Sequence, residues 1–238
     1  MIDIHHHLLY GVDDGPADAD TMRRMLETAA QEGVHAVIAT PHIAPGVTPF
    51  QPEKARDRLL EARRMVAAMG LKLTVWPGSE LLYTHQAASH LAQGRIPTLA
   101  GSDRVLVEFS QDIRLNALED ALREMLRAGT LPVLAHVERY SCLMQGWQQA
   151  AQIRQKHGVL YQVNAHTLLG GGSFWTRRTV RRLLLEGQVD FVASDAHDCV
   201  HRPCRMREAH EALTALVGKA YADELTGSLD TVQAFLDR

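Results

Sequence analysis

Short apolar runs rich in β-branched residues alternate along the chain with longer segments that have a helical period. In residues 18–32, apolar side chains recur at positions i, i+3, i+4, i+7 and i+8, as in an amphipathic helix, and Gly33 follows where such a helix commonly ends. Similar patterns predict helices over residues 52–69, 117–128, 146–157 and 176–186, and in the C-terminal segment. Strands are predicted over residues 2–5, 34–40, 71–78, 104–109, 131–136, 159–164 and 189–195.

The alternation of strands and helices restricts how the strands can pair. Parallel neighbours need a crossover segment, usually a helix, so the alternation predicts a parallel sheet. Seven such units fit either an open, doubly wound sheet or a closed, TIM-like barrel. No Pro-, Gly- or Ser-rich linker and no shift of composition divides the chain, which predicts one α/β domain over residues 1–238.

Polar residues follow almost every predicted strand. Six of the seven predicted strands end in a histidine or a carboxylate. The exception is the strand over residues 159–164, which ends in Asn164, two residues before His166. The C-terminal ends of parallel strands meet on one face, where the sites of both architectures lie. We therefore expect these polar side chains to lie together. They are His5, His7, Asp14, His42, Glu80, Glu108, His136, Asp195 and His197.

Each of these residues by itself is more often a hydrogen-bonded loop residue than a ligand, but their combination favours a metal site. Buried charges that converge on one rim must be paired or bound to metal. His5 and His7 are two positions apart on a strand and can face one ion, and Asp195 and His197 repeat this spacing. Nine candidate ligands suit two or three ions. Mixed imidazole and carboxylate ligands favour Mn²⁺, Fe or Zn²⁺ without deciding among them.

Two arginines lie close to this rim in the sequence. Arg139 follows His136 by three residues, and Arg202 follows His197 by five. Either could be a solvated loop residue. Two guanidinium groups beside metal ions would instead bind a phosphoryl group in a bidentate manner, which is the interpretation we favour.

Composition restricts the function classes. The 238 residues include 25 Lys and Arg against 28 Asp and Glu, a net charge of −3, so no general positive field attracts nucleic acid. No apolar run approaches the length of a membrane span, and the N-terminus lacks the pattern of a secretory signal. Three cysteines form an odd, sparse set that is typical of a reducing compartment. We expect a soluble cytoplasmic protein that does not insert into a membrane.

One motif suggests a different chemistry. Cys199 and Arg205 have the C-x₅-R spacing of cysteine-dependent tyrosine phosphatases, whose loop binds phosphate through successive backbone N–H groups. The residues between them contain no glycine, and Pro203 removes one donor. We therefore expect no phosphate-binding loop at this position.

The order of the motifs resembles that of a known superfamily. D-x-H-x-H, D-D-G, T-P-H, G-x-E, a strand ending in E-F, A-H-x-E-R and S-D-x-H form the pattern of the PHP (polymerase and histidinol phosphatase) superfamily. The fuller matches MIDIHHH, VDDGP, IATPH, PGSE, RIPTL, VEF, PVLAHVERY and FVASDAH most resemble the manganese-dependent bacterial protein-tyrosine phosphatases of the CpsB/YwqE type. The resemblance extends over essentially the whole chain.

This resemblance implies a distorted TIM-like (β/α)₇ barrel with three divalent ions, commonly Mn²⁺, at the C-terminal ends of its strands. The first ion would be held by His5, His7, Glu80 and Asp195. Glu80 would bridge to the second ion, whose other ligands would be Glu108 and His136. The third ion would be held by Asp14, His42 and His197.

The resemblance also assigns roles around the ions. Arg139 and Arg202 match the catalytic arginines that bind the substrate phosphate. His166 is a further candidate for substrate contact, and His166 or His201 could donate a proton to the leaving group. His6, between two ligands, is expected to point away from the ions.

The activity implied is hydrolysis of phosphotyrosine by a metal-activated hydroxide. The implied protein substrate is a membrane-associated tyrosine autokinase that controls capsule and exopolysaccharide synthesis, and many relatives form a homo-oligomer. A small-molecule phosphatase such as histidinol-phosphatase shares the metal pattern and stays as the alternative. A nuclease is disfavoured because the chain lacks a basic tract. A regulatory protein without turnover is disfavoured because every expected ligand is present.

Overall fold

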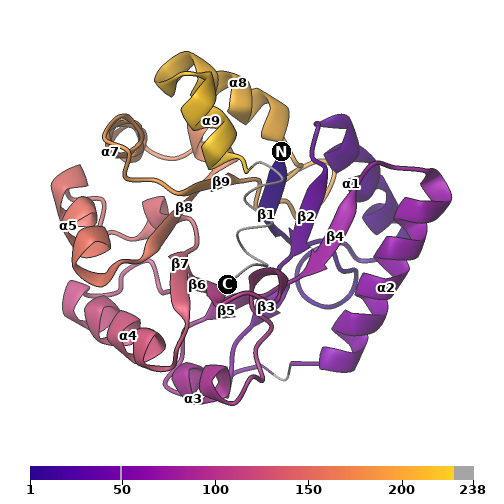
Figure 1. Cartoon of the computed structure of the whole chain (residues 1–238), viewed down its shortest axis with the longest axis horizontal. Helices are drawn as coiled ribbons and strands as arrows, with labels where there is room; N and C mark the ends of the chain where they lie inside the picture. Colours follow the sequence, from indigo (N-terminus) through magenta and orange to yellow (C-terminus); the bar gives the residue numbers. More distant parts are fainter. Residues whose placement is uncertain (49, 228–238) are drawn as a thin grey trace.

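Parallel β-strands lie at the centre of the fold and helices surround them (Figure 1). The computed structural model describes residues 1–48 and 50–227, and the strands within these ranges form two sheets. The first has the order β1-β2-β4 and the second the order β3-β5-β6-β7-β8-β9. The strands are β1 Ile2–His6, β2 Ala36–Ala39, β3 His42–Ile43, β4 Thr74–Pro77, β5 Glu80–Leu82, β6 Arg104–Glu108, β7 Leu131–Leu134, β8 Leu160–Asn164 and β9 Phe191–Ala193.

All seven predicted strands are present, and two short strands were not predicted. The chain of β2 continues into β3, and that of β4 continues into β5, so each pair crosses from the first sheet to the second. β3 and β5 have two and three residues, too few to give a hydrophobic period. Both carry candidate ligands, His42 and Glu80, and they pair directly with each other.

The helices connect successive strands on the outside of the sheets (Figure 1). The five internal helices predicted from the sequence are confirmed to within about two residues at either end. Residues 228–238 of the predicted C-terminal helical stretch lie outside the described residues. The α-helices are α1 Ala19–Gln31, α2 Pro52–Met69, α3 Ala87–Ala92, α4 Leu115–Arg127, α5 Trp147–His157, α6 Ala165–Leu168, α7 Phe174–Leu185, α8 Met206–Val217 and α9 Lys219–Leu225.

Apolar side chains fill both faces of the sheets. The larger buried cluster lies between the strands and the helices and includes Met22, Met25 and Met125. A second cluster joins the other faces of the strands, with Ile4, Ile38, Leu106, Val133 and Ala193 among its members. A sheet that is apolar on both faces is typical of parallel α/β folds. Most of the buried polar residues lie at or just beyond the strand ends, and Asp3 and Gln162 are exceptions within β1 and β8.

None of the helices in residues 1–48 and 50–227 combines the length and the apolar character that a bilayer crossing requires.

Candidate metal centre

Four donor atoms from three parts of the chain converge at the centre of the site. We call their residues the inner group: His5, His7, Glu80 and Asp195. Glu80 Oε2 lies 3.2 Å from Nε2 of both His5 and His7, and these two nitrogens are 3.2 Å apart. Asp195 Oδ1 lies 3.3 Å from His5 Nε2 and 3.6 Å from His7 Nε2. All four side chains are at most 4% exposed.

A register irregularity in β1 determines where its histidines point. The pairing of β1 with β2 shifts between Asp3 and His6. Ile4 belongs to the second apolar cluster described above, and His5 and His7 lie in the inner group. His6 instead lines a small void with Met25 of α1. β-Bulges near active sites commonly re-aim side chains in this way, and the expectation that His6 points away is confirmed.

The second oxygen of Glu80 extends the cluster in another direction. Glu80 Oε1 lies 2.9 Å from His136 Nε2, and Glu108 Oε1 lies 3.3 Å from the same nitrogen. His42 Nδ1 lies 3.2 Å from Glu80 Oε2. Glu80 thus places one oxygen in the inner group and the other beside His136 and Glu108, as a bridging carboxylate does.

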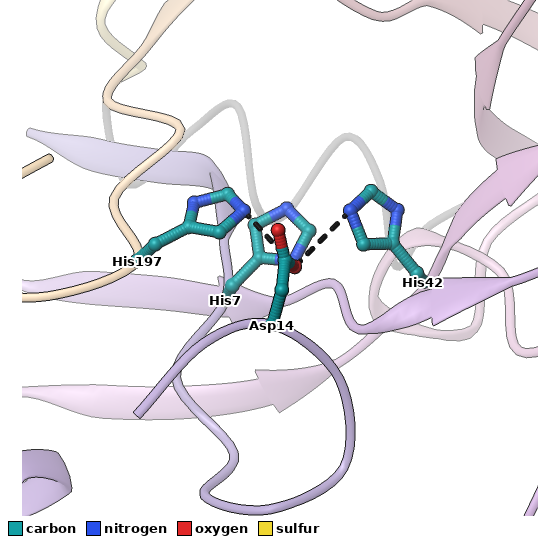
Figure 2. Close-up of side chains that lie close together, drawn as sticks. All are labelled: His7, Asp14, His42 and His197. Atoms are coloured by element: carbon teal, nitrogen blue, oxygen red, sulfur yellow. Dashed lines mark ion pairs between the residues drawn. The ribbon is translucent and has the colours of Figure 1, made fainter. Parts of the chain in front are cut away.

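The remaining candidates form an outer group: Asp14, His42 and His197. Asp14 Oδ1 lies 3.3 Å from Nε2 of each of the two histidines. Figure 2 shows its carboxylate between the two imidazoles, with His7 close behind. The rings of His7 and His197 stack with their centroids 3.8 Å apart. Asp14 is 60% exposed and His42 36%, so this group opens to solvent.

Two of the candidate ligands, His136 and Asp195, have an unusual backbone conformation. His136 has φ 33° and Asp195 has φ 54°, and Ala100 is the third non-glycine residue with positive φ among those described. This conformation is costly for side chains other than glycine and persists only where the surroundings enforce it. Each residue lies just after a strand, so the turn aims its side chain back across the sheet ends.

The hydrogen bonds of the imidazoles leave their Nε2 atoms facing the cluster. Nδ1 of His5 bonds to Gln162 Oε1 at 3.1 Å, Nδ1 of His7 to Asp13 Oδ2 at 2.7 Å, and Nδ1 of His197 to the carbonyl oxygen of Asp195 at 3.0 Å. An acceptor at Nδ1 holds the proton there and leaves Nε2 as a lone pair for a ligand. The buried Nε2 of His197 has no hydrogen-bond partner among the described residues.

Gln162 and Asn164 support the inner group from β8. Gln162 Oε1 accepts from the backbone N–H of His136 at 2.7 Å as well as facing His5, and Gln162 Nε2 donates to Asn164 Oδ1 at 2.8 Å. Asn164 Nδ2 in turn donates to Asp195 Oδ2 at 2.7 Å. Asn164 was recognisable in the sequence as a strand-end residue, whereas Gln162 was not predicted. Its signal was a polar residue in the middle of a strand that is otherwise apolar.

The carboxylates and imidazoles of the cluster strongly stabilise each other's charged forms. Burial lowers the pKa of His7, but its hydrogen bonds to Asp13 and Glu80 outweigh burial and raise the pKa to about 10. Burial likewise opposes ionisation of Glu80, yet the neighbouring histidines hold its pKa well below the usual range. A spacing of about 3.3 Å between donor atoms also matches the edge of a tetrahedron whose metal–ligand distances are about 2.0–2.2 Å. Donor type, spacing and charge therefore fit divalent cations.

A cavity of about 420 Å³ adjoins the inner group. Arg139 and Arg202, both partly exposed, line it together with His166 and His201. The two guanidinium groups converge, because Arg139 Nη2 and Arg202 Nη2 donate to Asp195 Oδ2 at 2.9 and 2.8 Å. The structure thus brings all twelve candidate site residues to one face, and the arginines lie where an anion beside the cluster would be bound.

The cysteine alternative finds no support in the geometry. Cys199 does not line the cavity, and burial raises the pKa of its thiol, which disfavours a thiolate. Arg205 forms two hydrogen bonds with Glu208, at 2.9 and 2.6 Å. The expectation that residues 199–205 form no phosphate loop agrees with this arrangement.

The fold and the site define an α/β protein with candidate metal-ligand groups at its strand ends, beside a cavity lined by two arginines. The chain belongs to the family described as capsular polysaccharide synthesis, CpsB/CapC, whose model matches residues 1–230. It is 30% identical over 230 residues to the tyrosine-protein phosphatase CpsB of Streptococcus pneumoniae, with 94% of each chain covered. It is 29% identical over 209 residues to the tyrosine-protein phosphatase YwqE of Bacillus subtilis, covering 88% of this chain and 82% of YwqE.

A solved structure supports the same relationship. It comes from the crystal structures of YwqE from Bacillus subtilis and CpsB from Streptococcus pneumoniae, described as unique metal-dependent tyrosine phosphatases. It matches with a TM-score of 0.88 and 27% identity, and the match covers 100% of this chain and 94% of the other. The resemblance found in the sequence motifs is confirmed.

Proposed function

We propose that this protein is a metal-dependent protein-tyrosine phosphatase that hydrolyses phosphotyrosine at the strand ends of its parallel sheets. One observation carries the proposal: the Nε2 atoms of His5 and His7 lie 3.2–3.6 Å from Glu80 Oε2 and Asp195 Oδ1, directly beside a cavity lined by Arg139 and Arg202. A metal cluster next to two guanidinium groups suits a phosphoryl group, whose charge both can neutralise.

The donor set would suit three ions. The inner group would hold the first, Glu80 with Glu108 and His136 would hold the second, and the outer group of Asp14, His42 and His197 would hold the third. The two Glu80 oxygens face different histidines, which supports a role for Glu80 in both of the first two sites. Imidazole and carboxylate ligands suit Mn²⁺, which we propose as the ion, and also Fe and Zn²⁺.

Bound divalent ions supply hydroxide from water near neutral pH and neutralise charge on phosphoryl oxygens. The protein's own groups orient the substrate. Arg139 and Arg202 each use one N–H on Asp195 Oδ2 and keep other N–H groups for the equatorial oxygens of the phosphate. Asn164 shares that carboxylate oxygen, so Asp195 holds both arginines in place.

The leaving group makes a modest demand on the protein. The phenol of tyrosine has a pKa of about 10, so its phenolate departs with less acid assistance than an alkoxide. His166 and His201 line the cavity and are the candidates to contact the substrate and to protonate the departing oxygen.

The chain's relatives supply a physiological context. The family's connection with capsular polysaccharide synthesis and the names of the relatives favour a phosphotyrosine protein as substrate. We propose a membrane-associated tyrosine autokinase, as the family resemblance implies. The three cysteines are free, which is consistent with the cytoplasm. The family resemblance extends the proposal to a homo-oligomer of single-domain chains.

We further propose that the two sheets are parts of one distorted (β/α)₇ barrel in a single domain of residues 1–238. The backbone N–H of Asp195 donates to His5 O, and that of His7 to Ala196 O, both at 2.9 Å, which places β1 beside the segment after β9. The parallel bridge between His6 and Ala196 agrees with this pairing. These contacts support closure on one side of the barrel.

The test uses chelator-treated protein and a tyrosine-phosphorylated peptide, with Mn²⁺, Fe²⁺ or Zn²⁺ added back. We expect metal to restore turnover in the parent chain and not in His136→Ala, which removes a donor beside Glu80 and Glu108. A parallel assay with histidinol phosphate addresses the alternative function, which the named relatives do not favour. Faster hydrolysis of histidinol phosphate than of the peptide would overturn the tyrosine-phosphatase proposal and leave the metal site standing.

A further inference from the structure

Helix α7 presents an exposed face that combines aromatic and basic side chains. Phe174 is 61% exposed and Trp175 70%, and their rings contact each other edge to face. The buried face of the helix carries Val180, Leu183 and Leu184. The exposed residues recur at helical spacing, so they share the opposite face. We call them the α7 face: Phe174, Trp175, Arg178, Arg181, Arg182 and Leu185.

The positive charge on the α7 face is mostly unpaired. Arg182 forms an ion pair with Glu186 at 2.6 Å and lies over the ring of Trp147. Arg178 and Arg181 form no ion pair or side-chain hydrogen bond with the residues that the structure describes. They are three positions apart and therefore neighbours on the helix surface. In a chain with a net charge of −3, two free neighbouring guanidinium groups form a local site for an anion.

The α7 face begins beside the catalytic cavity. α6 follows β8 directly, and its His166 lines the cavity. Gly171 packs so closely on His166 that an added Cβ would meet the imidazole at 2.2 Å. Arg177 donates to the carbonyl oxygens of Gly170 and Gly172 at 3.0 and 2.6 Å, which ties this turn to the first turns of α7. In Figure 1, α7 is seen nearly end-on in the ring of helices, between α5 and α8.

We propose that the α7 face binds the acidic and aromatic residues that flank the phosphotyrosine of a protein substrate. The proposal rests on the phosphatase function proposed above. With a rise of about 1.5 Å per residue, Arg178 and Arg181 lie about 6 and 10 Å along the helix from its first residue. An extended peptide advances about 3.3 Å per residue, so about three of its residues span the distance from Phe174 to Arg181 along α7. Phe174 and Trp175 pack against aromatic flanking residues, and the two arginines bind carboxylates or a second phosphate.

The experiment compares the metal-loaded parent protein with Arg178→Glu/Arg181→Glu and with Trp175→Ala. The substrates are a small aryl phosphate, a phosphotyrosine peptide with acidic flanks, and the same peptide with Asn and Gln flanks. The matched control is Arg56→Glu/Arg64→Glu on α2, which makes the same charge change at two other exposed arginines. For the acidic peptide we expect kcat/KM of the α7 double variant to fall about tenfold at low salt, and less at high salt. Its rates on the aryl phosphate and the neutral peptide stay within about twofold of the parent.

Several outcomes would overturn the inference. An equal loss in the α2 control would indicate a net-charge effect, and an equal loss on the aryl phosphate would indicate a disturbed catalytic site. If the α7 variants instead lose binding to phosphatidylserine vesicles, or a self-associated state, with unchanged peptide kinetics, the face binds a membrane or a second copy. Fluorescence anisotropy of the labelled peptide separates the two proposals. If the parent protein hydrolyses none of the three substrates, the proposed function fails, while a loss of acidic-peptide binding in the double variant would still support the α7 face.

Discussion

The inner and outer groups adjoin each other at the same strand ends but are held in place differently. Every side chain of the inner group is buried, and its histidines are oriented by the buried Gln162 and by Asp13. In the outer group, Asp14 is largely exposed and His42 partly exposed, and the carboxylate of Asp14 contacts two histidines and approaches Arg202 to 3.9 Å. Buried, fully hydrogen-bonded ligands are preorganised, whereas exposed ones must be ordered by the ion. We expect the inner group to bind its ion more tightly.

Removing the carboxylate that serves both the inner group and His136 tests the comparison most severely. Glu80→Gln replaces a charged oxygen by an amide between His5, His7 and His136. We expect kcat/KM on an aryl phosphate to fall about 10³-fold or more, because the charge that binds the ions and aligns the histidines is lost. Glu186→Gln, which removes a surface ion pair with Arg182, is the control and should change the rate less than twofold. Metal content after dialysis is the second readout.

Asp14→Ala weakens the outer group alone. We expect activity at limiting Mn²⁺ to fall about a hundredfold and to recover to within about tenfold in excess Mn²⁺, because the exposed third site can refill from solution. The comparison is a titration of rate against free Mn²⁺ for the parent, this variant and Asp20→Ala, a similarly exposed carboxylate on α1. A variant that excess metal does not rescue would contradict the difference between the groups.

Gln162→Leu tests whether the hydrogen bonds from β8 orient the ligands of the inner group. Loss of the acceptor for His5 Nδ1 and for the backbone N–H of His136 should weaken inner-group metal affinity about tenfold, since such orienting partners are commonly worth 10–100-fold. Gln162→Glu keeps the acceptor and should lose less. Mn²⁺ dissociation constants from chelator competition measure the effect, and thermal unfolding of the metal-free proteins controls for packing. Equal affinities in the parent and Gln162→Leu would show that β8 does not orient the ligands.

The smallest expected effect is that of Cys199→Ser. The thiol lies outside the cavity, so kcat/KM should stay within about twofold of the parent when measured beside His136→Ala. An inactive Cys199→Ser with a full complement of metal would replace the metal mechanism by a cysteine nucleophile.

Much of the site was predictable because strand order and residue type restrict it strongly. Parallel strands bring their C-terminal ends together, so a histidine or carboxylate after each apolar run has to reach one face. The expected burial held for His136 and Asp195, while Glu108 is 21% exposed and only partly buried. Gln162 was missed because a single amide within an apolar strand is more often a satisfied core residue than a positioning group. The pattern of residue types does not tell the adjacent Asp13 and Asp14 apart, and the family resemblance selected Asp14. In the structure, Asp13 bonds to His7 Nδ1, while Asp14 lies beside His42 and His197.

The sequence alone predicted the parallel α/β class, the seven longer strands, the nine metal-ligand candidates and the two arginines. Such features are predictable because hydrophobic period and residue chemistry are local properties. Only the tertiary structure decided which donor atoms meet. The shifted register of β1 turns His5 and His7 inward and His6 outward. Positive φ angles at His136 and Asp195 and the short strand β5 then aim three strand ends at one point. These features depend on contacts between strands that are distant in the sequence, such as β1 with β2 and β3 with β5, which no local pattern records.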